Sequence, residues 1–476
     1  MTSRASGDAI VVGSGPNGLA AAIHLARAGV GVTVLEAQDT VGGAARSAEL
    51  TLPGFISDFG AAILPLGAAS PFFRTLPLSE HGVEWIHPDF ALAHPLDDGS
   101  AAVLDRSVDV TAQSLGRDAR AYRLLMQPLA RHWQGIALDI LSLPHPPRSP
   151  VSLARFGFFG VHSATGLART LFRGPRARAL FAGLGAHSFL PIDQRPSAAI
   201  GLMLMMLAHG VGWPLPRGGT QRFTDGLVSY LQSLGGRIVT GTTVTSLADV
   251  PAGGATLFDV TPRQLLTIAG DEFPKYYRRQ LSAYRYGSGV FKVDYALDGP
   301  VPWKASECSH AGTVHLGGTM QEIAVSEREV WQGKPPQKPF VLIAQQSLFD
   351  PTRAPNGKQV LWAYCHVPNG SSFDMTERIE TQIERFAPGF KDRILARSVM
   401  TPKELQCRDA NLVGGDINGG VADFRQLFMR PALRINAYAT PIRDLYICSS
   451  STPPGGGVHG MSGYLAAKTA LKRSFR

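Results

Sequence analysis

The chain has few cysteines, no long apolar run and a long stretch without acidic residues. Its four cysteines are too widely spaced for a disulfide scaffold or a Cys-x-x-Cys redox pair, which is typical of a protein from a reducing compartment. No uninterrupted apolar run approaches the ~20 residues needed to span a bilayer. The first strand-like run begins at Asp8, which leaves no space for a secretory leader. These absences predict a cytoplasmic protein.

Composition argues against three further classes. With 44% hydrophobic and 17% charged residues over 476 positions, the chain can fill the cores of two interleaved domains, which excludes wholesale disorder. The formal net charge of +9 is not accompanied by a recognisable basic motif with exposed aromatics, so we expect no nucleic-acid partner. No pair of histidines or carboxylates has convincing metal-ligand spacing, so we also expect no metal site.

A glycine-rich turn, Gly13-x-Gly15-x-x-Gly18, lies between a strand-like run over 8–12 and a helix-like run over 16–28. In that setting the first glycine permits the tight turn, the second lets the backbone approach a diphosphate, and the third lets helix pack on strand. The unpaired N–H groups of the helix N-terminus then face the phosphates. Glu36 ends the next strand-like run, where an acid can accept both ribose hydroxyls. The pattern predicts a dinucleotide-binding unit.

The residues after Glu36 separate flavin from nicotinamide nucleotides. The stretch 36–47 contains Gly42-Gly43 and, after two alanines, Arg46. It resembles the acid, Gly-Gly and Arg/Ser signature of the flavoprotein superfamily that includes amine oxidases, protoporphyrinogen oxidase and phytoene desaturases. In that family the glycines and the Arg run along the flavin diphosphate and ribityl chain, a role that suits a guanidinium. The two inserted alanines favour the phytoene desaturase branch over the amine oxidases.

A second glycine-rich turn, Gly455-Gly456-Gly457, follows a buried strand-like run over 445–448 and precedes a helix-like run that contains Met461. In the family this loop lies under the isoalloxazine ring, where the positive helix end stabilises negative charge on the reduced flavin. The stretch 453–461, together with 42–45 and 53–55, resembles the group that contains pyridine nucleotide-disulphide oxidoreductase domain-containing protein 2.

The resemblance covers most of the chain and implies an α/β fold. We expect a glutathione-reductase-like FAD-binding Rossmann domain interleaved with an α+β substrate domain that carries a helical cap. The FAD-binding domain would comprise 1–65, 216–270 and 436–476, and the substrate domain 66–215 and 271–435. Within the middle piece of the FAD-binding domain, a strand pair over 237–240 and 243–247 would precede a last strand over 255–262.

The resemblance also implies that FAD is held by both glycine-rich turns, by the stretch after Glu36 and by one residue beside the adenine. The residues expected to contact FAD are Gly13, Ser14, Gly15, Pro16, Asn17, Gly18, Glu36, Ala37, Gly42, Gly43, Ala44, Arg46, Val244, Gly457, Val458 and Met461.

No acidic residue lies between Asp139 and Asp193. Arginines alternate there with apolar residues, a pattern that suits a helical cap over the substrate pocket with its basic side in water. The same pattern would suit contact with an anionic membrane, with arginines at the headgroups and aromatics below. The aromatic and leucine residues concerned are Phe156, Phe158, Phe159, Leu167, Leu171, Phe172 and Phe181.

Candidates for chemistry are few, because a flavin accepts the hydride itself. His459 lies in the second glycine-rich loop, where it could exchange a proton or only stabilise the loop through a hydrogen bond. Lys292 interrupts an apolar strand-like run, and alternation along the run favours a solvent-facing side chain over a flavin-facing one.

The chain has one complete dinucleotide fingerprint, so we expect electrons to leave the flavin for oxygen or a quinone rather than a nicotinamide. The leading hypothesis is an FAD-dependent oxidoreductase that desaturates an apolar isoprenoid or lipid-like substrate by hydride transfer to flavin N5. A flavin-dependent isomerase or saturase, an amine oxidase and a non-catalytic flavin-bound interaction protein remain as alternatives.

Overall fold

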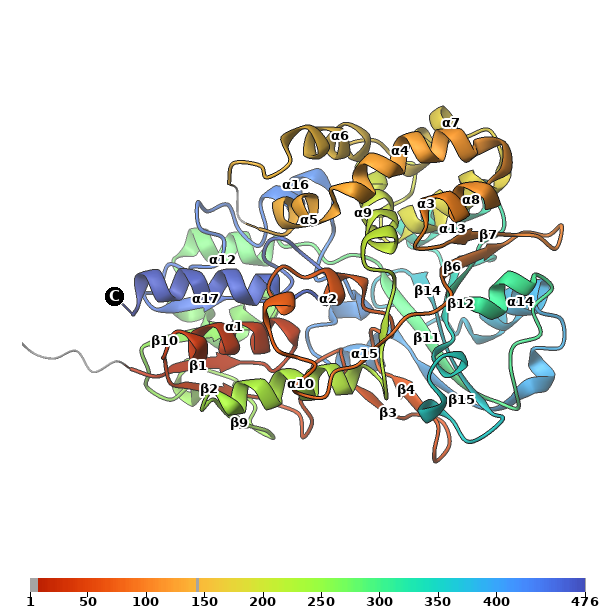
Figure 1. Cartoon of the computed structure of the whole chain (residues 1–476). Coiled ribbons are helices and arrows are strands. Elements are labelled where there is room, and N and C mark those ends of the chain that lie inside the picture. The colour runs from red at the N-terminus through yellow and green to blue at the C-terminus, as the bar shows by residue number, and fades with distance from the viewer. Residues whose placement is uncertain (1–6, 143–144, 476) are drawn as a thin grey trace, which may run out of the picture.

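Two β-sheets of different topology organise the computed structural model, which describes residues 7–142 and 145–475 (Figure 1). The first is fully parallel and has the strand order β16-β10-β1-β2-β9. Its strands are β1 (Ala9–Val12), β2 (Val32–Leu35), β9 (Arg237–Val239), β10 (Ala255–Phe258) and β16 (Leu445–Ile447). Strands from both ends and the middle of the chain therefore share one sheet, which confirms the predicted Rossmann-type unit.

Helices cover both faces of the parallel sheet, because its strands alternate two sets of apolar side chains. Val11 and Val34 pack with the helices of one face, and Ile10 and Leu35 pack with those of the other. The first face carries α1 (Pro16–Arg27), α10 (Thr220–Ser233) and α17 (Met461–Arg473), and the second carries α11 (Pro262–Ala269) and α12 (Lys275–Ser282).

The second sheet is mostly antiparallel and has the order β15-β11-β14-β13-β12-β6-β7. Its strands are β6 (Phe90–Pro95), β7 (Ala101–Leu104), β11 (Gly289–Leu297), β12 (Ala311–Leu316), β13 (Val341–Ala344), β14 (Gln359–Val367) and β15 (Ile394–Met400). One face packs on α14 (Thr376–Phe386), and the other packs on α13 (Met320–Trp331) and the helices between 108 and 210.

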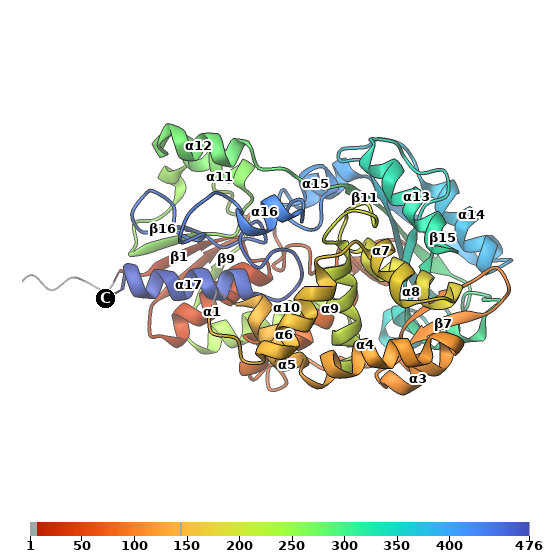
Figure 2. The same cartoon turned by 90° about the horizontal axis from the view of Figure 1, so that it is seen from above.

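Those helices form the predicted cap (Figures 1 and 2). They are α3 (Val108–Ser114), α4 (Ala119–Arg131), α5 (Trp133–Leu141), α6 (Pro150–Gly160), α7 (Ala164–Leu171), α8 (Pro175–Ala186) and α9 (Ser197–Gly210). Among the helices within the described ranges, none combines the length and the apolar character that crossing a bilayer requires.

The structure departs from the predicted strand over 243–247. The chain instead forms a short 3-10 turn, Leu247–Asp249, that begins after a capping box at Ser246. The carboxylate of Asp249 accepts hydrogen bonds from the backbone N–H groups of Thr245 and Ser246. These N–H groups are therefore not available for hydrogen bonds to a neighbouring strand.

Packing around the parallel sheet extends beyond the predicted boundaries of the FAD-binding domain. Phe72 and Phe73 belong to the same apolar core as α1 and α17, although they lie in the stretch 66–215 assigned to the substrate domain. Tyr277 and Leu281 of α12, in the stretch 271–435, pack against β10. Residues 1–6 of the predicted domain lie outside the described residues.

Helix α17 packs against α1, which joins the two ends of the chain. A Cβ on Gly463 would lie 1.7 Å from the carbonyl oxygen of Asn17, so the backbones touch only because this residue is glycine. Gly463→Ala should therefore destabilise the protein by about 1–3 kcal/mol through overpacking. The measurement is the melting temperature of the purified variant by thermal denaturation.

Gly157 provides a matched control, because it lies within α6 and a Cβ there would meet no atom within 4 Å. Gly157→Ala should leave the melting temperature unchanged or raise it, because alanine is the better helix former by about 0.5–1 kcal/mol. Equal effects of the two substitutions would contradict the proposed α1–α17 constraint.

Candidate functional site

The first glycine-rich turn joins β1 to α1 at the carboxyl end of the parallel sheet. Gly13 has φ +100°, and a Cβ on Gly18 would lie 2.0 Å from the carbonyl oxygen of Gly13. Pro16 begins α1, a position where the missing N–H costs nothing. The turn therefore has the tight geometry that brings a helix N-terminus to a diphosphate.

Glu36 lies at the carboxyl end of β2 and closes the turn from the side. One carboxylate oxygen accepts the backbone N–H of Ser14 at 2.9 Å and its hydroxyl at 2.5 Å, and the other accepts the N–H of Gln38 at 2.9 Å. The acid is thus held in the place where the sequence predicts a ribose partner. Ala37 is exposed beside it.

The stretch after Glu36 folds back over the turn. The N–H of Gly42 donates to the carbonyl and hydroxyl oxygens of Ser14, both at 3.2 Å. A Cβ on Gly43 would lie 3.2 Å from Cα of Gly15, so the two segments nearly touch. Arg46 stacks over Phe59 and donates to the carbonyl oxygen of Arg408 at 3.1 Å.

The second glycine-rich loop reaches the same place from the other end of the chain. The hydroxyl of Ser70 donates to the carbonyl oxygen of His459 at 2.6 Å. A Cβ on Gly460 would lie 2.9 Å from Cβ of Ala20 in α1, and one on Gly457 would lie 2.5 Å from Leu66. The structure therefore brings the two turns together, with Met461 at the start of α17. Val458 packs in the core that α1 and α17 share.

His459 uses both ring nitrogens within its own loop. Its Nδ1 accepts the N–H of Met461 at 3.0 Å, and its Nε2 lies 3.2 Å from the carbonyl oxygen of Gly455. Burial lowers the pKa of the imidazole to about 4, against the smaller effects of the loop carbonyls. The sequence left two roles open for His459, proton exchange or a hydrogen bond that stabilises the loop. A neutral ring with both nitrogens bonded within the loop fits the second role.

Lys292 is buried, so the solvent-facing alternative is wrong. Only 2% of its surface is exposed, because β11 lies inside the second sheet and both of its faces are covered. The ammonium contacts the carboxylate of Asp294, two residues along on the same face, and lies 5.8 Å from the ring centre of Trp362. Burial lowers the pKa of Lys292 against the opposing charge of Asp294.

A second buried ion pair joins the 3-10 turn Pro351–Arg353 to the short strand β4 (Ile56–Asp58). The guanidinium of Arg353 donates to Asp58 at 2.8 Å, and both side chains are fully buried. Burial alone would raise the pKa of Asp58, but Arg353 and hydrogen bonds from Ser47 and Thr220 lower it. Sequence reasoning missed this pair, because nearly 300 residues separate its members and neither lies in a motif.

The residues present fit a bound dinucleotide. Gly15 and Gly43 leave a cradle without side chains above the N-terminus of α1, and the buried side-chain oxygen of Asn17 has no partner among the described residues. Ala44, next to Gly43, packs against the cap core, and Val244 lies half-buried beyond the end of β2. Contact between these residues and FAD stays a prediction.

Asp259, directly after β10, is a second residue that sequence reasoning missed. It lies at the carboxyl end of a parallel strand, where ligands of such sheets bind, so its position was a usable signal. Its carboxylate accepts the N–H of Gly18 at 2.8 Å.

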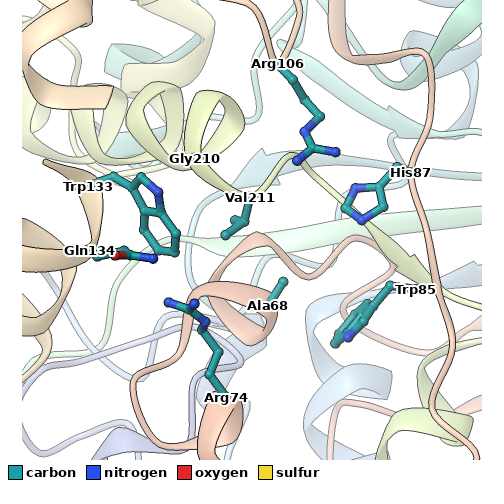
Figure 3. Close-up of a pocket in the computed structure, with 9 residues that line it drawn as sticks. All are labelled: Ala68, Arg74, Trp85, His87, Arg106, Trp133, Gln134, Gly210 and Val211. Atoms are coloured by element: carbon teal, nitrogen blue, oxygen red, sulfur yellow. The ribbon is translucent and has the colours of Figure 1, made fainter. Parts of the chain in front are cut away.

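A hollow of about 410 Å³ lies between α2 (Pro65–Ala69), the cap helices α5 and α9, and the segment around Trp85 (Figure 3). The guanidinium groups of Arg74 and Arg106 extend into it from opposite sides, and Arg74 lies over the ring of Trp133 at 5.1 Å. No acidic residue is among the described residues that line it. Ala68 of α2 lines the hollow, whereas its neighbour Gly67 faces the carbonyl of Val458, so α2 separates the hollow from the glycine loop.

Comparison with known proteins agrees with this geometry. The family model described as "Flavin containing amine oxidoreductase" matches residues 17–469. The chain is 28% identical to pyridine nucleotide-disulfide oxidoreductase domain-containing protein 2 of Mus musculus, with 98% of this chain and 93% of the relative covered. It is 24% identical to one of the chains of limonene dehydrogenase from Castellaniella defragrans (98% and 94% covered) and 24% identical to the neurosporene-forming phytoene desaturase of Rhodobacter capsulatus (96% and 92% covered).

Solved structures share the fold at lower identity. An oxidoreductase from Methanosarcina mazei aligns with a TM-score of 0.64 at 17% identity and covers 98% of this chain and 100% of that one. Cyclohexylamine oxidase from Brevibacterium oxydans aligns with a TM-score of 0.60 at 16% identity (99% and 100% covered). These likenesses confirm the predicted fold class.

The buried pair of Lys292 and Asp294 leads to a prediction about stability. Lys292→Met leaves the Asp294 carboxylate buried without its partner and should destabilise the protein by about 3–5 kcal/mol. The double variant Lys292→Met/Asp294→Asn should recover most of that loss, because no unpaired charge remains. Thermal denaturation of the single and double variants measures the difference. A single variant as stable as the wild type would contradict a structural ion pair.

Proposed function

The chain belongs to the family of flavin-containing amine oxidoreductases, and we propose that it acts there as an FAD-dependent dehydrogenase of an apolar, isoprenoid or lipid-like substrate. Its cofactor is FAD, as the sequence predicts. When bound, FAD supplies the acceptor for a hydride from a substrate C–H bond. The electrons would then pass to oxygen or a quinone.

The observation that carries the proposal is the continuity between the apolar cap and both glycine-rich segments. Ala44, beside Gly43, packs against the apolar core of the cap helices. Leu66 packs against the same core and against Gly457. A substrate that enters between cap and sheet would therefore meet apolar side chains up to the cofactor cradle, which favours a hydrocarbon over a charged amine.

The residues at this junction position and shield rather than transfer protons. His459 is held neutral by burial and bonded to its own loop, so it fixes the loop that precedes α17. The N-terminus of α17 points its positive end toward that loop, an arrangement that stabilises negative charge. The hydride would go to FAD when it is bound, and the neighbouring carbon would lose its proton to solvent water as the double bond forms, so no side chain is assigned as the base. The names of two relatives support the substrate class, because limonene and phytoene are isoprenoid hydrocarbons.

Anaerobic mixing tests the reaction directly. Purified protein loaded with FAD should lose its oxidised-flavin absorbance when mixed with the matching polyene or terpene, and the product should have two hydrogens fewer by mass spectrometry. Primary amines serve as the matched control and should leave the flavin oxidised. Bleaching by amines alone would favour an amine oxidase, and a product of unchanged mass would favour an isomerase.

We also propose that the cap contacts an anionic membrane surface through α6. Phe156, Phe172 and Phe181, expected at the membrane in that alternative, are instead buried in the cap core. Phe158 and Val151, however, are 67% and 83% exposed on the outer side of α6. The stretch 140–192 around them carries no acidic residue, and its exposed Arg148, Arg169 and Arg173 would meet anionic headgroups.

Flotation with vesicles tests this contact. The wild type should float with vesicles that contain anionic lipid. Val151→Asp/Phe158→Asp should remain at the bottom of the gradient, because it puts two charges in place of the exposed apolar residues of α6. Val325→Asp, at an exposed valine of α13, is the matched control and should float like the wild type. Absence of wild-type flotation would leave α6 as the solvent-facing side of a cap.

A further inference from the structure

The three glycines of the first turn surround one acidic side chain, Asp259. A Cβ on Gly13 would lie 3.2 Å from Cβ of Asp259, and a Cβ on Gly15 or Gly18 would lie 2.9 or 3.2 Å from its carboxylate oxygen Oδ2. Only 6% of Asp259 is exposed, and its carboxylate accepts the N–H of Gly18 in the first turn of α1. The absence of side chains in the turn therefore makes room for this carboxyl as well as for a nucleotide.

This position puts two anions at one helix terminus. The N-terminus of α1 is where the diphosphate of a dinucleotide binds in this fold. An ionised Asp259 already uses the positive end of the helix, and in a buried site it would repel the diphosphate strongly. A neutral Asp259 would still accept the Gly18 N–H through one oxygen and would carry no charge against the cofactor.

The titratable groups around Asp259 follow three elements. Glu36 follows β2, Asp409 follows α15 (Pro402–Arg408), and the thiol of Cys448 follows β16. Arg46 offsets part of the charge of Asp409. Burial raises the pKa of Asp259 to about 7, against the Gly18 N–H and with further repulsion from Asp409 and Glu36. The carboxyl is thus close to its titration midpoint near neutral pH.

We propose that Asp259 takes up a proton from solvent when FAD binds, so that the affinity for FAD falls as pH rises. The proton adds to one carboxylate oxygen, and no other bond forms or breaks. The inference rests on FAD as the cofactor and is independent of which substrate is oxidised. The sign follows from linkage: the bound state holds more protons than the free state, so each rise in pH above the midpoint weakens binding.

Titration of the apoprotein with FAD, followed by quenching of flavin fluorescence at constant ionic strength, tests the proposal. The dissociation constant of the wild type should rise about tenfold between about pH 6 and about pH 8, since one proton is linked to binding. Asp259→Asn keeps an oxygen for the Gly18 N–H but cannot ionise. Its dissociation constant should change less than about twofold over the same range.

Asp409→Asn is the matched control, because Asp409 is a second acid near the cradle, with an oxygen 3.7 Å from a Cβ on Gly43. This variant should keep a dissociation constant that rises with pH, with the rise starting at lower pH because loss of the Asp409 charge lowers the pKa of Asp259. A wild-type slope retained in Asp259→Asn, or lost in Asp409→Asn, would overturn the assignment to Asp259.

Calorimetry of the wild type provides a measurement that does not depend on a variant folding. Binding enthalpies in two buffers with different heats of ionisation give the protons taken up per FAD. About one proton should be taken up near pH 8, where free Asp259 is mostly ionised. Uptake of none would overturn the proposal while leaving FAD binding, and with it the proposed oxidoreductase, intact.

Discussion

The contact between α1 and α17 is the constraint on which the functional site depends. Gly463 lies against the carbonyl of Asn17 so closely that no side chain fits, and this fixes the distance between the first and last helices. Helix α1 begins within the first glycine-rich turn, and α17 begins directly after the second glycine-rich loop. The carboxyl ends of β1, β10 and β16 lie side by side in the parallel sheet. If both glycine-rich turns bind one cofactor, the distance between them must be fixed. The packing of α1 against α17 fixes it, whereas flexible loops alone would not.

Around this reference, the molecule separates its charges from its apolar surfaces. Acids gather at the cradle, where Glu36, Asp259 and Asp409 lie around the N-terminus of α1. One buried ion pair, Lys292 with Asp294, lies within β11, and a second joins Arg353 to Asp58, whereas the cap core supplies the apolar side chains. The combination places the acids around the glycine-rich turns and the apolar side chains in the cap core.

The sequence predicted the parts of this arrangement that depend on local pattern. The strand, turn and helix around Gly13 and the strand over 445–448 could be predicted, because period and glycine placement are local properties. Lys292 was misjudged because alternation assumes that one face of a strand meets water, whereas β11 is covered on both faces. The ion pair of Asp58 with Arg353 forms only in the folded protein, and no sequence motif around either residue indicates it.

The order of strands in the parallel sheet has a consequence for biosynthesis. β1, β2, β9 and β10 leave the ribosome before most of the antiparallel sheet, but β16 and α17 emerge only after it. Until then the edge of β10 that pairs with β16 is open, and the second glycine-rich loop has not been synthesised. If both glycine-rich turns hold the flavin, as the sequence predicts, the flavin site could be completed only after the last helix has been synthesised.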